Sequence, residues 1–153
     1  GEYGKNYRFE LVYFTDDDIP ELFVAEEFYH YAPVKVLTYR NSEVVELCEY
    51  GIYGQLNYIE RKSIVVIENQ SMGGNSGKII KINNDGTEKD LFSYQDNEGV
   101  VDEGSDELFY KINDKTVSKE EYYRVREENM SLETSSFYEG ISMTTENIDK
   151  YCS

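Results

Sequence analysis

The N-terminal part of the chain alternates between apolar and polar positions. The apolar positions from Tyr7 to Tyr13 are Tyr7, Phe9, Leu11 and Tyr13, which alternate with Arg8, Glu10 and Val12. This period of two is typical of a strand with one buried face. A second extended run, Glu21 to Ala25, follows the turn-forming segment Thr15 to Pro20, whose proline cannot donate to a ladder. The pattern therefore predicts two strands joined by a tight acidic turn.

Further apolar runs are separated by turn-forming residues, which predicts a series of hairpins. Asn41-Ser42 and Asp85-Gly86 are the clearest hairpin turns. The predicted strands are Val34 to Tyr39, Val44 to Cys48, Gln55 to Ile59, Ser63 to Glu68, Lys78 to Ile82, Thr87 to Tyr94 and Leu108 to Ile112. The glycine-rich segment Ser71 to Gly77 is predicted to be a flexible connection, and the acidic segment Gln95 to Glu107 an exposed loop.

A helix is predicted after the last strand. The Ser118 hydroxyl can accept from free backbone N–H groups, and Glu121 three residues later completes a capping box. The helix is expected to run to about Asn129 and to present Tyr122, Val125 and Tyr123 to the sheet. The segment 145–151 is a second, shorter helical candidate.

These elements predict an α+β fold that is mainly β. We expect a twisted antiparallel sheet of about seven to nine strands, curled toward a barrel or a single large blade, with the Ser118 helix packed on it. A length of 153 residues is near the commonest domain size, which predicts a single domain over residues 1–153.

The net charge of the chain disfavours some classes of binding partner. It carries 31 acidic and 15 basic side chains, a formal charge of -16, and this field repels phosphate backbones and anionic headgroups. Nucleic acid is therefore not an expected partner. No run approaches the roughly 20 apolar residues of a membrane-spanning helix. The two cysteines, Cys48 and Cys152, are predicted to be free thiols, with a disulfide between them as the alternative.

The acidic turn is a candidate metal site. Asp16, Asp17, Asp18 and Glu21 could present several oxygen ligands to calcium, which takes six to eight. A solvated turn is the favoured interpretation, because three consecutive aspartates cannot all point inward.

This part of the chain also resembles a known family. The strand, acidic turn and Ile19-Pro20-Glu21-Leu22-Phe23-Val24 are similar to the D-x-D-G-D-G-x-P-E-L-x-V signature of uncharacterised secreted proteins and lipoproteins of Gram-positive bacteria. When Pro20-Glu21-Leu22 is aligned, the alternate acidic positions fall on Tyr13, Thr15 and Asp17, and aspartates replace both glycines, so the motif is degenerate. The resemblance implies an extracellular or cell-surface anchored context and brings no enzymatic activity with it.

Other candidate sites depend on a few motifs. Gly73 to Lys78 departs from a phosphate-binding loop at two positions, Met72 and Ile79, and lies between strands. His30 is the only histidine, and no nucleophile motif accompanies it. Paired carboxylates for hydrolysis depend on three-dimensional spacing, so the sequence names no such pair.

Fifteen tyrosines and no tryptophan suit both a sheet core and a binding surface. The candidate binding residues are Tyr29, His30, Tyr31, Tyr50 and Tyr53, with Phe28 beside the first three. We therefore predict a noncatalytic exported domain of the cell envelope that binds a protein, peptide or glycan or acts as a spacer. The alternatives are a calcium-stabilised binding module and an acid-pair hydrolase. No cofactor is expected, and calcium is the alternative.

Overall fold

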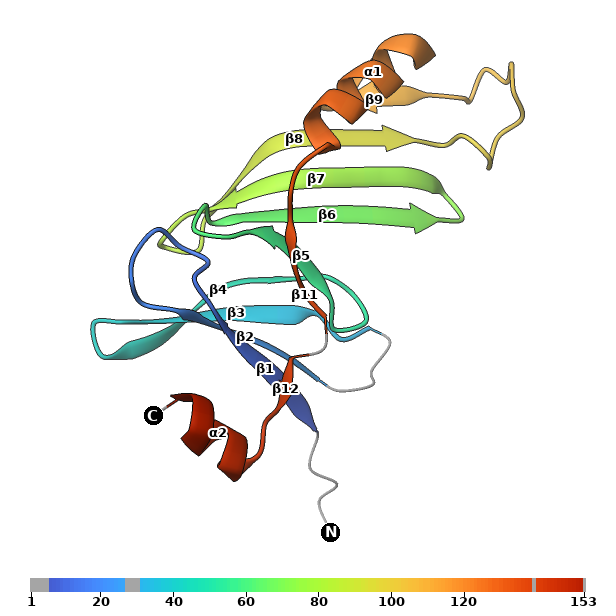
Figure 1. Ribbon diagram of the computed structural model, residues 1–153. Coiled ribbons are helices and arrows are strands. Elements are labelled where there is room, and N and C mark those ends of the chain that lie inside the picture. The colour runs from blue at the N-terminus through green and yellow to red at the C-terminus, as the bar shows by residue number, and fades with distance from the viewer. Residues whose placement is uncertain (1–5, 27–30, 139, 153) are drawn as a thin grey trace.

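The computed structural model describes residues 6–26, 31–138 and 140–152. These contain two antiparallel sheets and two helices (Figure 1). The five-stranded sheet has the order β12-β1-β2-β3-β4. Its strands are β1 (Tyr7–Val12), β2 (Glu21–Glu26), β3 (Val34–Arg40), β4 (Glu43–Tyr50) and β12 (Ile141–Ser142).

The seven-stranded sheet has the order β10-β9-β8-β7-β6-β5-β11. Its strands are β5 (Leu56–Ile59), β6 (Ile64–Ser71), β7 (Gly74–Ile82), β8 (Glu88–Asp96), β9 (Tyr110–Ile112), β10 (Lys115–Thr116) and β11 (Ser135–Phe137). The α+β, mainly β prediction is confirmed. One sheet has seven strands, within the expected seven to nine, but five further strands form a second sheet, and neither sheet closes into a barrel.

One shared core joins the two sheets. Phe23, Val34 and Val36 of the five-stranded sheet pack with Val65 and Ile80 of the seven-stranded sheet. The segment after α1 also connects them, since β11 pairs with β5 and β12 pairs with β1. Figure 1 shows this segment running from one sheet to the other.

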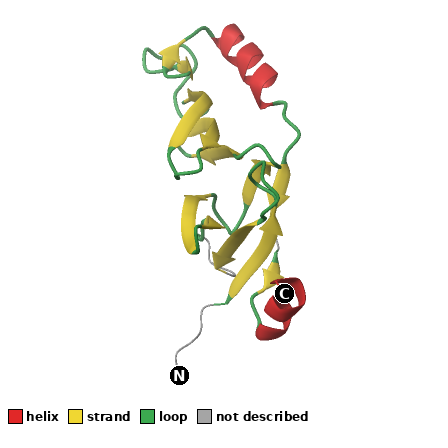
Figure 2. Cartoon of the chain, turned by 90° about the vertical axis from the view of Figure 1, so that its left-hand side faces the viewer, coloured by secondary structure: helices red, strands yellow, loops and turns green. Residues whose placement is uncertain are grey.

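Helix α1 (Lys119–Met130) covers one face of β8 and β9 and completes a second core. Ser118 caps it as predicted, because its Oγ accepts from the Glu121 N–H at 3.2 Å. Tyr122 is fully buried against Tyr94 and Tyr110. The second predicted helix is α2 (Thr145–Cys152), and Figure 2 shows α1 and α2 at opposite ends of the molecule.

Two predicted loops are corrected. Ser71 to Gly77 is largely a hairpin, in which β7 begins at Gly74. Glycine is needed there because a Cβ on Gly77 would lie 2.3 Å from the Tyr94 ring, and one on Gly74 2.0 Å from the Asp96 carbonyl oxygen. The predicted loop from Gln95 begins only after Asp96, whose side chain is buried.

Cys48 is buried and Cys152 exposed, and both are free thiols. Burial raises the pKa of the Cys48 thiol to about 12. Neither α1 nor α2 is long and apolar enough to span a membrane.

Candidate functional site

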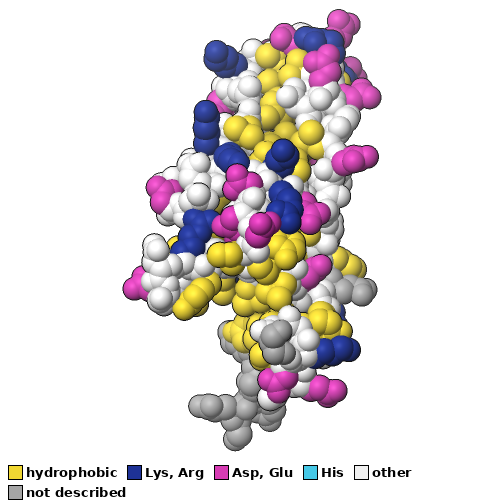
Figure 3. Space-filling view, turned by 60° about the vertical axis from the view of Figure 1, so that its left-hand side comes forward, with side chains coloured by type: hydrophobic (Ala, Val, Ile, Leu, Met, Phe, Trp, Pro, Cys, Tyr) yellow, Lys and Arg dark blue, Asp and Glu magenta, His cyan; other side chains and the backbone are white. Residues whose placement is uncertain are grey.

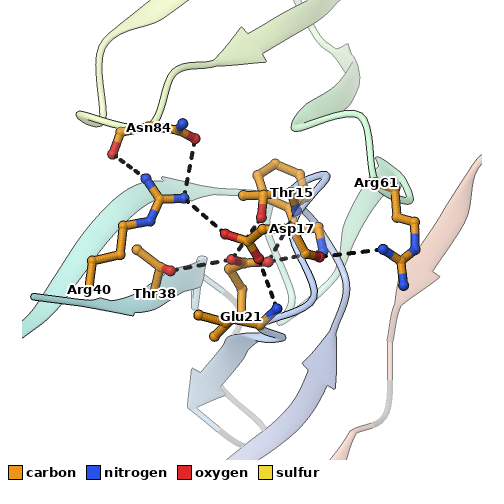
Figure 4. Close-up of polar contacts among 9 residues, drawn as sticks. Thr15, Asp17, Glu21, Thr38, Arg40, Arg61 and Asn84 are labelled. Atoms are coloured by element: carbon orange, nitrogen blue, oxygen red, sulfur yellow. Dashed lines mark hydrogen bonds and ion pairs between the residues drawn. The ribbon is translucent and has the colours of Figure 1, made fainter.

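The acidic turn lies where the two sheets meet. Strand β2 begins at Glu21, whose side chain is in phase with buried Phe23 and Ala25 and is 0% exposed. One carboxylate oxygen accepts from the Phe14 and Thr15 N–H groups, both at 3.1 Å. The other accepts from the hydroxyls of Thr15 at 3.1 Å and Thr38 at 3.3 Å. Glu21 therefore fixes its own turn to β3 (Figure 4).

The three aspartates are held on the outside of the same junction. Asp17 accepts from the Ile19 N–H at 2.9 Å and lies 3.8 Å from the Arg40 guanidinium, which also donates to Asn84 in the β7–β8 turn. Arg61 lies 3.5 Å from Asp18 and over the Tyr13 ring. Arg40 and Arg61 thus tie the turn to hairpins of both sheets (Figure 4).

The structure does not bring the four calcium candidates together as one ligand set. Glu21 points into the interior, where its oxygens already accept four hydrogen bonds, whereas Asp16 and Asp18 are exposed. In the part of the chain that is described, no group of three or more His, Cys, Asp or Glu residues could hold a metal ion.

The candidate binding residues around the tyrosines do not form one site among the described residues. Tyr29 and His30, like Phe28, lie outside the described residues. Tyr31 and Tyr53 are 78% and 62% exposed. Tyr50, at the end of β4, is half-buried and lines a groove.

This groove has a volume of about 600 Å³. Its floor is the face of the seven-stranded sheet that α1 leaves open, and its wall comes from Pro33 and from Tyr50 to Ile52. The polar floor residues are Asn69, Ser76, Lys78, Ser93, Gln95 and Lys111. Such a concave site with a few convergent polar groups is the ordinary form of a ligand site.

The groove wall is fixed by a hydrogen bond between the two sheets. The Tyr50 hydroxyl donates to the Glu88 carboxylate of β8. Burial and then this bond raise the pKa of Tyr50, so its hydroxyl stays a donor. The sequence singled out Tyr50 by its residue type, but the floor residues are ordinary polar positions whose meeting depends on strand register.

A second polar cluster lies on the opposite face, beneath α1. Asp96 is 1% exposed and accepts from the Tyr122 hydroxyl at 2.5 Å, the Glu98 N–H at 2.9 Å and the Asn75 amide at 3.3 Å. Arg126 lies 4.0 Å from the same carboxylate. These contacts fasten the helix to the sheet.

Glu98 extends this cluster to the surface. It accepts from the hydroxyls of Tyr110 at 2.6 Å and Tyr123 at 2.8 Å and pairs with Lys119 at 3.2 Å. The two hydroxyls hold the pKa of Glu98 below its ordinary value. We name Asp96, Glu98, Tyr110, Tyr122, Tyr123 and Arg126 the tyrosine–carboxylate cluster. The sequence analysis missed it, although Asp96 stands in phase with Phe92 and Tyr94.

Together the fold and groove define a two-sheet, mainly β protein with one open polar sheet face. Comparison of the chain with protein-family models, curated proteins and solved structures found no match. The resemblance to secreted proteins and lipoproteins of Gram-positive bacteria therefore stays an expectation from the sequence.

Proposed function

We propose that this chain is a noncatalytic domain of the bacterial cell envelope that binds its ligand in the groove on the open face of the seven-stranded sheet. The observation that carries the proposal is the groove itself: a cavity of about 600 Å³ lined by a polar floor and a wall held by Tyr50 and Glu88. Concave sites of this size are suited to small ligands or to a short stretch of a polymer.

The charge distribution supports binding over simple spacing. On the face shown in Figure 3, basic and acidic side chains stand side by side across the middle of the molecule, with hydrophobic side chains above and below them. In the groove, Lys78 pairs with Asp90 at 3.0 Å. A surface that needed only to be soluble would not require side chains of opposite charge to face each other inside a concavity.

The hydrolase alternative requires two carboxylates that face each other, one with a raised pKa. Glu10 is a carboxyl whose pKa is raised by burial, but it lies on β1, which contributes no residue to the groove. This separation favours binding over acid-pair hydrolysis.

The test is sedimentation of the domain with isolated Gram-positive cell walls. We expect saturable binding by the wild-type protein and at least about a tenfold loss for Lys78→Glu, which reverses the charge on the groove floor. Lys115→Glu makes the same change at an exposed residue outside the groove lining and should stay within about twofold. No binding by the wild-type protein, or equal losses in both variants, would overturn the proposal.

A further inference from the structure

The register of four strands places polar side chains in a row across the groove floor. Asn69 on β6 lies opposite Ser76 on β7, Ser76 opposite Gln95 on β8, and Gln95 opposite Lys111 on β9. Directly opposed residues in antiparallel strands share a face. At about 4.8 Å per strand, the row spans about 14 Å.

The row points away from α1. Its neighbours along the strands, Gly77 and Tyr94, lie on the helix-covered face, where the Tyr94 ring packs on Tyr122. Lys78 and Ser93 form the next opposed pair on the floor, with Ile67 beyond Lys78. The open face is therefore mainly polar over the middle strands of the sheet, with Ile67 beside the polar residues.

The amides and hydroxyls of this floor have unused hydrogen-bonding capacity. Among the residues that the structure describes, Asn69, Ser76, Ser93 and Gln95 have no side-chain hydrogen-bond partner. Each can both donate and accept. This capacity matches ligands whose own groups do both, as the hydroxyls of sugars do.

Two features disfavour other ligand classes. Strand addition by a peptide uses free backbone groups at a sheet edge, whereas β6, β7 and β8 each have a hydrogen-bonded strand on both sides. The charged lining residues are the acids Glu49, Glu88, Asp90 and Asp114 and the bases Lys78 and Lys111. Four acids against two bases leave a charge of -2, which disfavours a polyanion.

The wall adds an apolar surface to the polar floor. Tyr50, fixed by its bond to Glu88, stands with Pro33 and Ile52 along one side of the groove. A sugar ring likewise combines an apolar C–H face with a rim of hydroxyls, and an aromatic ring suits such a face.

We propose that the groove binds a neutral oligosaccharide. Its hydroxyls form hydrogen bonds with the row of side chains from Asn69 to Lys111, and its apolar face packs against Tyr50 in the groove wall. This inference rests on the proposed function, because it names the ligand class of the same groove.

The experiment is an NMR titration of the ¹⁵N-labelled domain with three probes: chitotriose, cellotetraose and the anionic trigalacturonate. We expect chitotriose or cellotetraose to shift the amide signals of Ser76, Ser93 and Gln95 while those of α2 stay unchanged. Trigalacturonate should bind at least about tenfold more weakly because of the negative lining.

Two glutamines provide the matched control. Gln95→Ala removes one member of the row and should weaken binding of the neutral probe by about tenfold or more. Gln70→Ala removes the same side chain from β6, where Gln70 lies opposite Asn75 on the α1 side of the sheet, and should change binding by less than about twofold.

The outcomes separate the two proposals. If neither neutral probe binds at up to about 10 mM, or trigalacturonate binds more tightly than both, the oligosaccharide assignment is overturned. The proposed function still stands in that case if Lys78→Glu abolishes cell-wall sedimentation, and the groove then takes a peptide or charged polymer. If sedimentation also fails, both proposals are wrong.

Discussion

Two buried carboxylates, Glu21 at the core shared by the two sheets and Asp96 in the core beneath α1, are satisfied in different ways. Glu21 has short, local partners: two backbone N–H groups of its own turn and two threonine hydroxyls. Asp96 depends mainly on long side chains, those of Tyr122 and Arg126 from α1 and Asn75 from β7. A buried charge must be hydrogen-bonded to be tolerated. Glu21 meets this requirement mainly within its own turn and the adjacent strand, and Asp96 mainly with side chains of a helix packed on the sheet.

The difference predicts different consequences for folding. The Glu21 site joins β2, β3 and the turn at the shared core of both sheets, so its loss should weaken the whole molecule. The Asp96 site joins one helix to the end of β8 in one sheet, so its loss should open that part locally.

The largest effect is expected for Glu21→Ala. The substitution leaves the buried N–H groups of Phe14 and Thr15 without an acceptor, which should lower the free energy of unfolding by about 3 to 4 kcal/mol. Glu21→Gln should cost only about half as much, because its remaining oxygen can accept from the two N–H groups while the hydroxyls of Thr15 and Thr38 rotate to accept from the new amide. Urea denaturation measures both.

Asp18→Ala is the control for this prediction. Asp18 belongs to the same turn, but its side chain is 98% exposed, and the change should cost less than about 0.5 kcal/mol. Equal losses for Glu21→Ala and Asp18→Ala would show that the buried hydrogen bonds do not hold the junction.

A smaller and more local effect is expected for Tyr122→Phe. The hydroxyl donates to buried Asp96, and its removal should cost about 1.5 to 2 kcal/mol, since Asn75 and the Glu98 N–H still serve the carboxylate. Hydrogen exchange should accelerate in α1 and β9 and stay unchanged in β1 to β3.

Tyr123→Phe is the matched control, because its hydroxyl donates to the more exposed Glu98 and its ring is 41% exposed. We expect about 0.5 kcal/mol. If Tyr122→Phe instead raised exchange equally in both sheets, the two ends would unfold as one unit and the contrast between the carboxylates would disappear.

The sequence predicts the parts of this picture that depend on local pattern. The turn at Asn41-Ser42 has positive φ at both residues, as a two-residue hairpin requires, and the Ser118 cap forms as expected. The alternation of buried and exposed positions also places both buried acids on the inner side of their strands, because Glu21 is in phase with Phe23, and Asp96 with Tyr94. Because acidic residues are rarely fully buried, this phase alone does not predict their burial.

Other features depend on contacts between distant segments and have no local signature. Gly74 to Gly77 has the composition of a loop, but Gly77 is required by the ring of Tyr94, seventeen positions later. The division into two sheets and the row of polar residues across the groove depend on strand order and register. Alternation along one strand cannot specify these.

Alkaline pH should loosen the α1 end without acting on the Glu21 junction. Burial, and then hydrogen bonds to Glu98, raise the pKa values of Tyr110 and Tyr123 to about 12. The folded protein thus holds these protons more tightly than the unfolded chain, whose tyrosines ionise near pH 10. This contribution to stability is complete below pH 10 and is lost as the pH rises toward 12.

Absorbance of tyrosinate, combined with hydrogen-exchange protection of α1 between pH 9 and 12, measures this loss. We expect a high-pH ionisation phase that coincides with loss of protection in α1, while β2 and β3 stay protected. Ionisation of all tyrosines near pH 10 in the folded protein would contradict the burial of this cluster.

Calcium should have the smallest effect, and it tests the outer side of the Glu21 junction. The carboxylate of Glu21 is already occupied by hydrogen bonds, and Asp17 and Asp18 lie beside Arg40 and Arg61. We expect 5 mM calcium chloride to change Tm by less than about 1 °C relative to EDTA, whereas an occupied site at about 100 Kd would raise it by roughly 5 to 10 °C. Magnesium at equal ionic strength is the control, because any divalent ion screens a charge of -16. A rise in Tm that is specific to calcium and is removed by Asp17→Asn would contradict this expectation. It would show that the turn binds the ion and that Asp17 is a calcium ligand in preference to an ion-pair partner of Arg40.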